Sequence, residues 1–130
     1  MTQEEKQVLL KDLCARLPYG VIVQYKGHNS IVKNKLLTGS DLDCNMEYYK
    51  PYLRPMSSMT EEEKRHISKM TLLRTYDNGV VYDIPYDVYT PYYVMEDCLN
   101  YLRSIHIDYS GLIEKELAIE VTEENNPYKE

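Results

Sequence analysis

The sequence predicts an α+β fold in which a short antiparallel meander, or a small partial barrel, is packed by an N-terminal helix and a C-terminal amphipathic helix. Apolar residues recur at helical spacing near the start of the chain and again after residue 90. Between these two stretches, branched and aromatic residues alternate with a period of two, and turn sequences interrupt the alternation. We expect one domain over residues 1–122 and a polar, frayed C-terminal tail over 123–130.

The first helix is predicted from Thr2 to Leu17. Thr2 and Glu5 have the spacing of a capping box, and Pro18 ends the helical pattern. Leucines recur along one side as an apolar stripe that we expect to face the core. Asp12 and Arg16 lie off that stripe, so we expect them on the polar side of the helix.

Three short strands are predicted next, over 21–25, 31–37 and 42–46, with turns at 26–29 and 38–41 between them. Tight turns between consecutive strands are typical of an antiparallel meander, and such a meander needs helices to cover one face.

The stretch from Lys50 to Glu63 has two interpretations. Pro51 and Pro55 restrict the backbone and predict a rigid connector, followed by a helix that starts with a Thr60–Glu63 capping box. In the structural interpretation, four apolar side chains anchor this connector to the core, namely Tyr52, Leu53, Met56 and Met59.

In the functional interpretation, the same stretch is a binding surface. Lys50 and Arg54 present cations beside the Tyr52 ring and the hydroxyls of Ser57 and Ser58. Such a group can hold a phosphate or an acidic partner. Both interpretations remain open from the sequence alone.

The second helix is followed by a predicted hairpin around Asp77-Asn78-Gly79 and then by a tyrosine-rich segment. Tyr86 and Tyr89 are the candidate binding residues of this segment, either packed under the loop or exposed beside Asp83 and Asp87. If exposed, the acids and phenols could imitate nucleic acid or dock a basic protein.

The last helix is predicted from Thr90 to His106, with His106 as a positive charge at the helix C-terminus. Residues 117–122 then alternate again and predict a closing strand.

Composition excludes several classes of function. The net charge of −6 and pI of about 5.1 argue against non-specific nucleic-acid or anionic-membrane binding. No apolar run has the length of a membrane span, the first twenty residues lack the apolar core of a secretory signal, and three cysteines without CxxC spacing fit free thiols. We therefore expect a cytoplasmic protein. Fourteen tyrosines, with no Phe or Trp, must also fill core positions, and each buried hydroxyl then needs a partner.

No pattern in the sequence predicts catalysis. The glycine-rich phosphate loop, the GxSxG and HExxH motifs and paired CxxC are all missing. His28, His66 and His106 do not share a helical face, so neither a metal site nor a cofactor is expected. A non-enzymatic protein is the favoured class.

Two passages, KPYLRPMSSMTEEE at Lys50–Glu63 and DYSGLIEKELAIE at Asp108–Glu120, resemble recurring blocks in small uncharacterised proteins of gut Bacteroidales phages and mobile elements. The opening VLLKDLCARLPYGV is similar to the same group. The resemblance implies a phage or prophage accessory protein in the cytoplasm of a bacterial host, and it implies no activity or cofactor.

Two functions follow as hypotheses. The first is a protein-interaction module that binds a host or phage protein through the Lys50–Ser58 loop or the tyrosine-rich segment. The second is a counter-defence protein that sequesters a nucleotide messenger, since cations beside tyrosine rings can clasp phosphate and stack a base.

Overall fold

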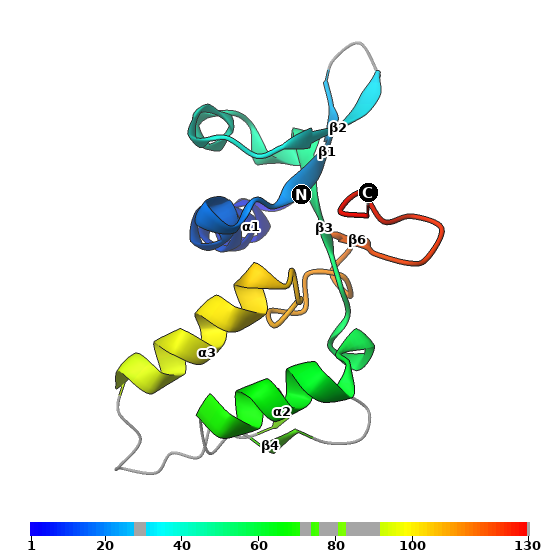
Figure 1. Cartoon of the computed structure of the whole chain (residues 1–130). Coiled ribbons are helices and arrows are strands. Elements are labelled where there is room, and N and C mark those ends of the chain that lie inside the picture. Colours follow the sequence, from blue (N-terminus) through cyan, green and yellow to red (C-terminus); the bar gives the residue numbers. More distant parts are fainter. Residues whose placement is uncertain (28–30, 71–73, 76–80, 83–91, 130) are drawn as a thin grey trace.

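The computed structural model describes residues 1–27, 31–70, 74–75, 81–82 and 92–129, and it has an α+β architecture (Figure 1). Its α-helices are α1 (Gln3–Arg16), α2 (Glu61–Met70) and α3 (Tyr92–Ser104). Its strands are β1 (Ile22–Lys26), β2 (Val32–Leu36), β3 (Tyr49–Leu53), β4 (Arg74–Thr75), β5 (Val81–Tyr82) and β6 (Ile119–Glu120). Short 3-10 helices occupy Leu17–Tyr19, Gly39–Asp43, Met46–Tyr48 and Met56–Ser58.

The main sheet has the strand order β2-β1-β3-β6. The β1–β2 hairpin is confirmed, but β3 returns beside β1 and not beside β2, so the strands do not follow one another as a meander. β6 pairs with β3 in parallel, which makes the sheet mixed, and the sheet is not closed into a barrel. β4 and β5 form a separate two-stranded ladder, and the Asp77–Gly79 turn predicted between them lies outside the described residues.

The third strand lies later in the chain than the sequence predicts. Residues 42–46 belong to 3-10 turns and the loop between them, whereas β3 includes Pro51 from the expected connector. Leu37 donates its N–H to the Val21 carbonyl, and this bond sets which backbone groups of β1 point toward β2 and which toward β3. Backbone groups of successive residues alternate in direction along β3, so Pro51 occupies a position at which an N–H group would point away from β1. On that side of β3, pairing with β6 begins only at the next residue, Tyr52. A proline is tolerated at such a position because no ladder bond is lost.

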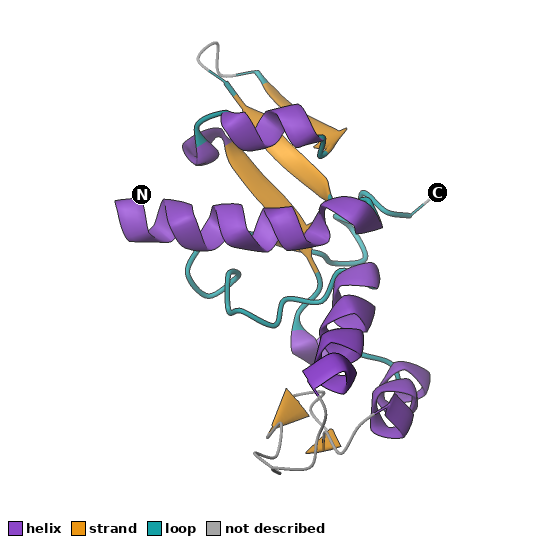
Figure 2. Ribbon diagram, turned by 90° about the vertical axis from the view of Figure 1, so that its left-hand side faces the viewer, coloured by secondary structure: helices purple, strands orange, loops and turns teal. Residues whose placement is uncertain are grey.

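Helix α1 lies across one face of the sheet (Figure 2). Its Thr2–Glu5 capping box is present, and Leu9 and Leu13 pack with Val23 and Tyr49 in the first core cluster. The prediction that Asp12 and Arg16 lie on the polar side of this helix is wrong, because both residues are buried.

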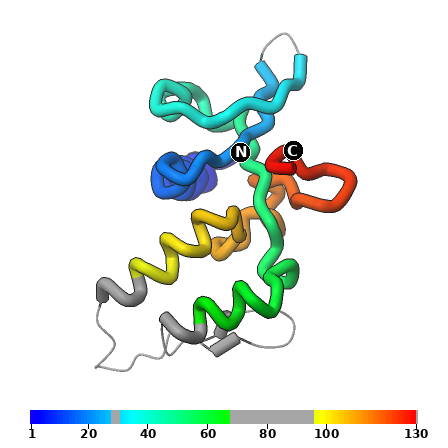
Figure 3. The backbone as a smooth tube through the Cα atoms, viewed as in Figure 1, coloured from blue at the N-terminus to red at the C-terminus, as the bar shows by residue number. Residues whose placement is uncertain are grey.

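A second core cluster joins α2 and α3, through residues that include Met59, Ile67, Cys98 and Leu102. The chain passes from one cluster to the other along β3 (Figure 3). Arg54 and Ile107 form a parallel bridge just beyond the strand, and the Thr60–Glu63 capping box begins α2 as expected.

Helix α3 ends in a Schellman motif. His106 has a positive φ of 63°, and the N–H groups of His106 and Ile107 donate to the carbonyls of Arg103 and Leu102. His106 is not the positive helix charge that we expected. Burial, together with Arg16 and Arg54, lowers the pKa of its imidazole to about 4, so the ring is neutral at pH 7.

The C-terminal residues contact the sheet on the side away from α1 (Figure 1). Tyr128 stacks on His106 with ring centroids 3.8 Å apart, and its hydroxyl donates to the Tyr52 carbonyl at 2.7 Å. The expectation of a frayed tail is therefore wrong for Tyr128. β6 itself covers only two residues of the predicted closing strand.

Candidate functional site

The residues proposed from the sequence as a single binding group fall into separate places. Lys50 and Tyr52 belong to β3, with Lys50 exposed and Tyr52 buried. Arg54, Ser57 and Ser58 follow the strand and belong to the turn before α2. The candidates of the tyrosine-rich segment, Tyr86 and Tyr89, lie outside the described residues, as do Asp83 and Asp87.

Arg54 holds the start of α2. Its Nη1 and Nη2 donate to the two carboxylate oxygens of Glu63 at 2.9 and 2.7 Å. The remaining donors reach the Ser58 hydroxyl, the Ser58 carbonyl and the Ile105 carbonyl. Each of the five guanidinium N–H groups thus has a protein acceptor. The Arg54 hydrogen bonds and the Thr60 cap lower the pKa of Glu63, so the pair is charged at neutral pH.

The apolar side chains of the same stretch are anchored as the structural interpretation expects. Leu53 is fully buried, and Met59 and Tyr52 are nearly so. With its donors occupied, Arg54 has no N–H left for a phosphate unless the Glu63 pair breaks. Ser57 is exposed and lines a groove of about 500 Å³ with Met56 and Tyr109.

Tyrosine does fill core positions, and the hydroxyls of two buried rings, Tyr49 and Tyr52, and of the half-buried Tyr109 each have a partner. Tyr49 donates to Asp41 at 3.2 Å, and Tyr52 donates to Asn34 at 2.8 Å. Burial and the neighbouring Cys44 and Asp41 raise the pKa of Tyr49. The Tyr109 hydroxyl accepts from Arg103 at 2.8 Å.

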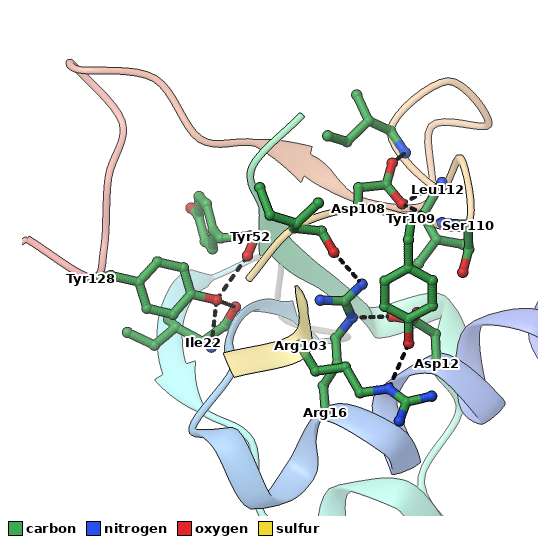
Figure 4. A network of polar contacts seen from close by, with 12 residues as sticks. Asp12, Arg16, Ile22, Tyr52, Arg103, Asp108, Tyr109, Ser110, Leu112 and Tyr128 are labelled. Carbon is green, nitrogen blue, oxygen red and sulfur yellow. Dashed lines mark hydrogen bonds and ion pairs between the residues drawn. The ribbon is translucent and has the colours of Figure 1, made fainter. Parts of the chain in front are cut away.

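A buried arginine that the sequence reasoning missed connects α1 to the end of α3 (Figure 4). Arg16 Nε donates to Asp12 at 2.7 Å, Nη2 donates to the Ile107 carbonyl at 2.7 Å, and the guanidinium lies 4.8 Å from the Tyr109 ring centroid. Burial raises the pKa of Asp12, while Arg16 acts in the opposite direction. Asp12 Oδ1 and Arg16 Nη1 have no hydrogen-bond partner among the described residues. Because Arg16 is fully buried, no ligand can reach its guanidinium group directly, and we interpret its contacts with Asp12 and Ile107 as structural.

The most exposed apolar side chains of the described residues lie on and beside β2. Val32 is 49% exposed and Leu36 is 57% exposed, and Ile31 immediately before the strand is 63% exposed. Val32, Asn34 and Leu36 alternate with Lys33, whose ammonium lies on the core side over the Tyr25 ring. The first three side chains therefore share the sheet face that is turned away from α1.

β2 is also the last strand of its sheet within the described part of the chain. Since the Leu37–Val21 bond directs the N–H and C=O groups of alternate residues toward β1, the backbone groups of Val32, Asn34 and Leu36 point outward. We call these three residues, with their outward backbone groups, the β2 edge. An unpaired edge with apolar side chains is a template for another strand.

Lys26 and Lys50 lie on the same outer face as the β2 edge, since Lys26 pairs with Val32 and Lys50 pairs with Gln24 opposite Asn34. Both lysines are exposed. Of the described candidates from the sequence, Lys50 thus lies on the same face as this edge, and the Tyr52 hydroxyl donates to its residue Asn34. The turn at 26–29 predicted a returning strand over 31–37, but only the strand order shows that this strand is an edge.

Two pockets described by the structure suit an anion poorly. The groove beside Ser57 is lined by Asp108, Glu114 and Glu120. The other, of about 410 Å³ between α2 and α3, contains Glu62 and Glu63 with Arg65, His66 and Tyr101. Among the described lining residues of each pocket, carboxylates outnumber the Lys and Arg side chains. No group of three or more possible metal ligands occurs among the described residues.

No helix in the described ranges has both the length and the apolar character needed to cross a membrane. Nothing matches this chain in comparisons with protein-family models, with curated proteins or with solved structures.

Proposed function

We propose that the chain is a non-enzymatic protein-interaction module that docks an extended segment of a host or phage protein along the β2 edge. The observation that carries the proposal is the coincidence of outward backbone groups with the exposed side chains of Val32 and Leu36. When a strand is added at a sheet edge, backbone hydrogen bonds provide the affinity and contacts with exposed side chains provide the specificity.

The biological context of the proposal comes from the sequence. The resemblance of Lys50–Glu63 and Asp108–Glu120 to blocks in phage and mobile-element proteins supports a phage or prophage accessory protein in the bacterial cytoplasm. Binding of a nucleotide messenger is the weaker candidate, because Arg54 is occupied by Glu63 and the two described pockets are rich in carboxylates.

Two variants of Asn34 test the docking surface. Asn34→Pro removes the outward N–H at the centre of the edge, whereas Asn34→Ala removes only the side chain that accepts from Tyr52. We expect the Ala variant to capture the same proteins from phage-infected host lysate as the natural chain, and the Pro variant to lose them. Mass spectrometry of the captured proteins gives the readout.

Leu36→Ser provides a second test that keeps the backbone intact, because Leu36 is exposed and its loss should not affect folding. Urea unfolding of all three variants separates lost binding from lost stability. Unchanged capture by both Asn34→Pro and Leu36→Ser would show that the β2 edge is not the docking surface.

A further inference from the structure

We infer that the segment docked at the β2 edge is an acidic β-strand in which acidic and apolar residues alternate. This inference rests on the proposed function and specifies its partner. Three features lead to it: the charge of the hairpin, the positions of its lysines on the two sheet faces, and the poor fit of a second copy of the chain.

The hairpin is basic in an otherwise acidic protein. Residues 21–40 contain Lys26, Lys33 and Lys35 and no acidic residue, although the whole chain has a net charge of −6. Lys50 adds a further exposed cation beside the hairpin. Such a local excess of positive charge attracts a partner of the opposite sign and disfavours a basic one.

A second copy of the chain fits the edge poorly. In an antiparallel pair related by a two-fold axis, centring the contact on Asn34 places Lys33 opposite Lys35 twice. Centring it on Lys33 or on Lys35 places that lysine opposite itself. Like charges directly opposite one another destabilise a strand pair, so these self-pairings are disfavoured.

The two lysines of the core-side face are held in place before any partner arrives. Lys35 forms an ion pair with Asp41 at 2.7 Å, and the Lys33 ammonium lies 5.8 Å from the Tyr25 ring centroid. Fixed side chains lose little entropy on binding. Because the Lys35 ammonium is already paired with Asp41, the Lys33 ammonium offers an acidic partner the larger unsatisfied charge.

The register on β2 then defines the partner's pattern. An added strand places alternate side chains beside Lys33 and Lys35 on the core-side face, where carboxylates complement them. The intervening side chains meet Val32 and Leu36 on the outer face, where apolar groups complement them. The predicted core is apolar–acidic–any–acidic–apolar.

Synthetic peptides with the cores VETEV, VTTTV and VKTKV, identical in their uncharged flanks, test the charge requirement. Fluorescence polarisation against the full chain at low salt should show the acidic peptide binding most tightly and the lysine peptide most weakly. One opposed charge pair changes affinity by up to about fivefold, and raising the salt should narrow the difference.

A charge exchange makes the test specific to β2. Lys33→Glu should weaken binding of the acidic peptide and strengthen binding of the lysine peptide. Lys11→Glu, an exposed change on α1, should leave the order of the peptide affinities unchanged and alter them only through the change in net charge. Asn34→Pro should abolish binding of both peptides.

The outcomes separate the inference from the proposed function. Equal binding of the three peptides, lost in Asn34→Pro, would overturn the acidic partner and leave the interaction module standing. A dimer in light scattering that Asn34→Pro dissociates would overturn the inference in favour of a second copy. Absence of peptide binding, with capture from lysate unaffected by Asn34→Pro, would overturn both.

Discussion

The hydroxyl of Tyr128 donates to the carbonyl oxygen of Tyr52 at 2.7 Å and accepts from the Ile22 amide at 3.0 Å. The register between β1 and β3, continued by one residue, would place Ile22 opposite Tyr52. The hydroxyl therefore lies where the next ladder hydrogen bond between the two strands would form. A residue from the C-terminal end of the chain thus completes the backbone hydrogen bonding of the sheet (Figure 4).

Tyr128→Phe should lower the free energy of unfolding by about 1–2 kcal/mol, because the partly buried amide and carbonyl lose their shared partner. Burial raises the pKa of Tyr128 to about 12, so the hydroxyl keeps its proton at neutral pH. Urea unfolding measures the effect, with the exposed Lys129→Ala as control. Equal stability of the two variants would mean that the tail does not hold the sheet.

Arg16→Met should destabilise the chain by about 3–5 kcal/mol, because Asp12 would remain buried without its ion pair. Adding Asp12→Leu should recover most of that loss, since replacing both charges by apolar groups is often nearly neutral. Thermal and urea unfolding of the single and double variants form the measurement. Lys11→Ala, an exposed neighbour, serves as control, and a double variant no more stable than Arg16→Met would contradict the prediction.

Arg54→Ala and Lys50→Ala should behave differently. Loss of Arg54 breaks the partly buried pair with Glu63 and the contacts to Ser58, at a cost of about 2 kcal/mol. Lys50 is exposed on the outer sheet face, so its loss should leave the melting temperature unchanged and weaken only partner binding. If Arg54→Ala unfolds like the natural chain, the Arg54–Glu63 pair does not stabilise the start of α2.

Stability should fall as pH is lowered from 7 to 5, through His106. Its pKa is about 4 in the folded chain against an ordinary value of 6.5, so in this window the unfolded chain binds a proton that the folded chain does not. Linkage then gives a loss of about 1–2 kcal/mol between these two pH values, because solvent screens part of the effect at this partly exposed ring.

Asn tolerates the positive φ of residue 106, so His106→Asn is the matched variant. Between pH 7 and pH 5, the free energy of unfolding of this variant should fall less than that of the natural chain, and the difference should equal the loss that linkage assigns to His106. The raised pKa of Asp12 acts in the opposite direction but is common to both chains and cancels in the comparison. Parallel pH profiles for the two chains would show that His106 does not titrate between the states.

Local features of the fold were predictable. The capping boxes at Thr2 and Thr60 and the β1–β2 hairpin depend on residues close together in the sequence, and all three are present. The third strand was misplaced because 42–46 alternates like a strand but forms 3-10 turns, in which Asp41 accepts from Thr38 and Lys35.

The candidate site was only partly predictable. Lys50 was proposed as an exposed cation and lies beside the β2 edge, but Arg54 was proposed with it and holds Glu63. The capping box predicted a role for Glu63 at the start of α2, but the residue spacing did not indicate that Glu63 also binds Arg54.

By itself, the sequence determined the α+β class, the helices and the hairpin, because capping, turn and periodicity signals operate over a few residues. Only the tertiary structure decided the strand order, the burial of Arg16 and the position of Tyr128. Those features depend on partners far along the chain: the Arg16–Ile107 bond spans 91 positions and the Ile22–Tyr128 bond spans 106. A buried charged or tail residue needs partners that replace its lost hydration. The partners Ile107 of Arg16 and Tyr52 of Tyr128 lie too far along the chain for a local pattern to record them.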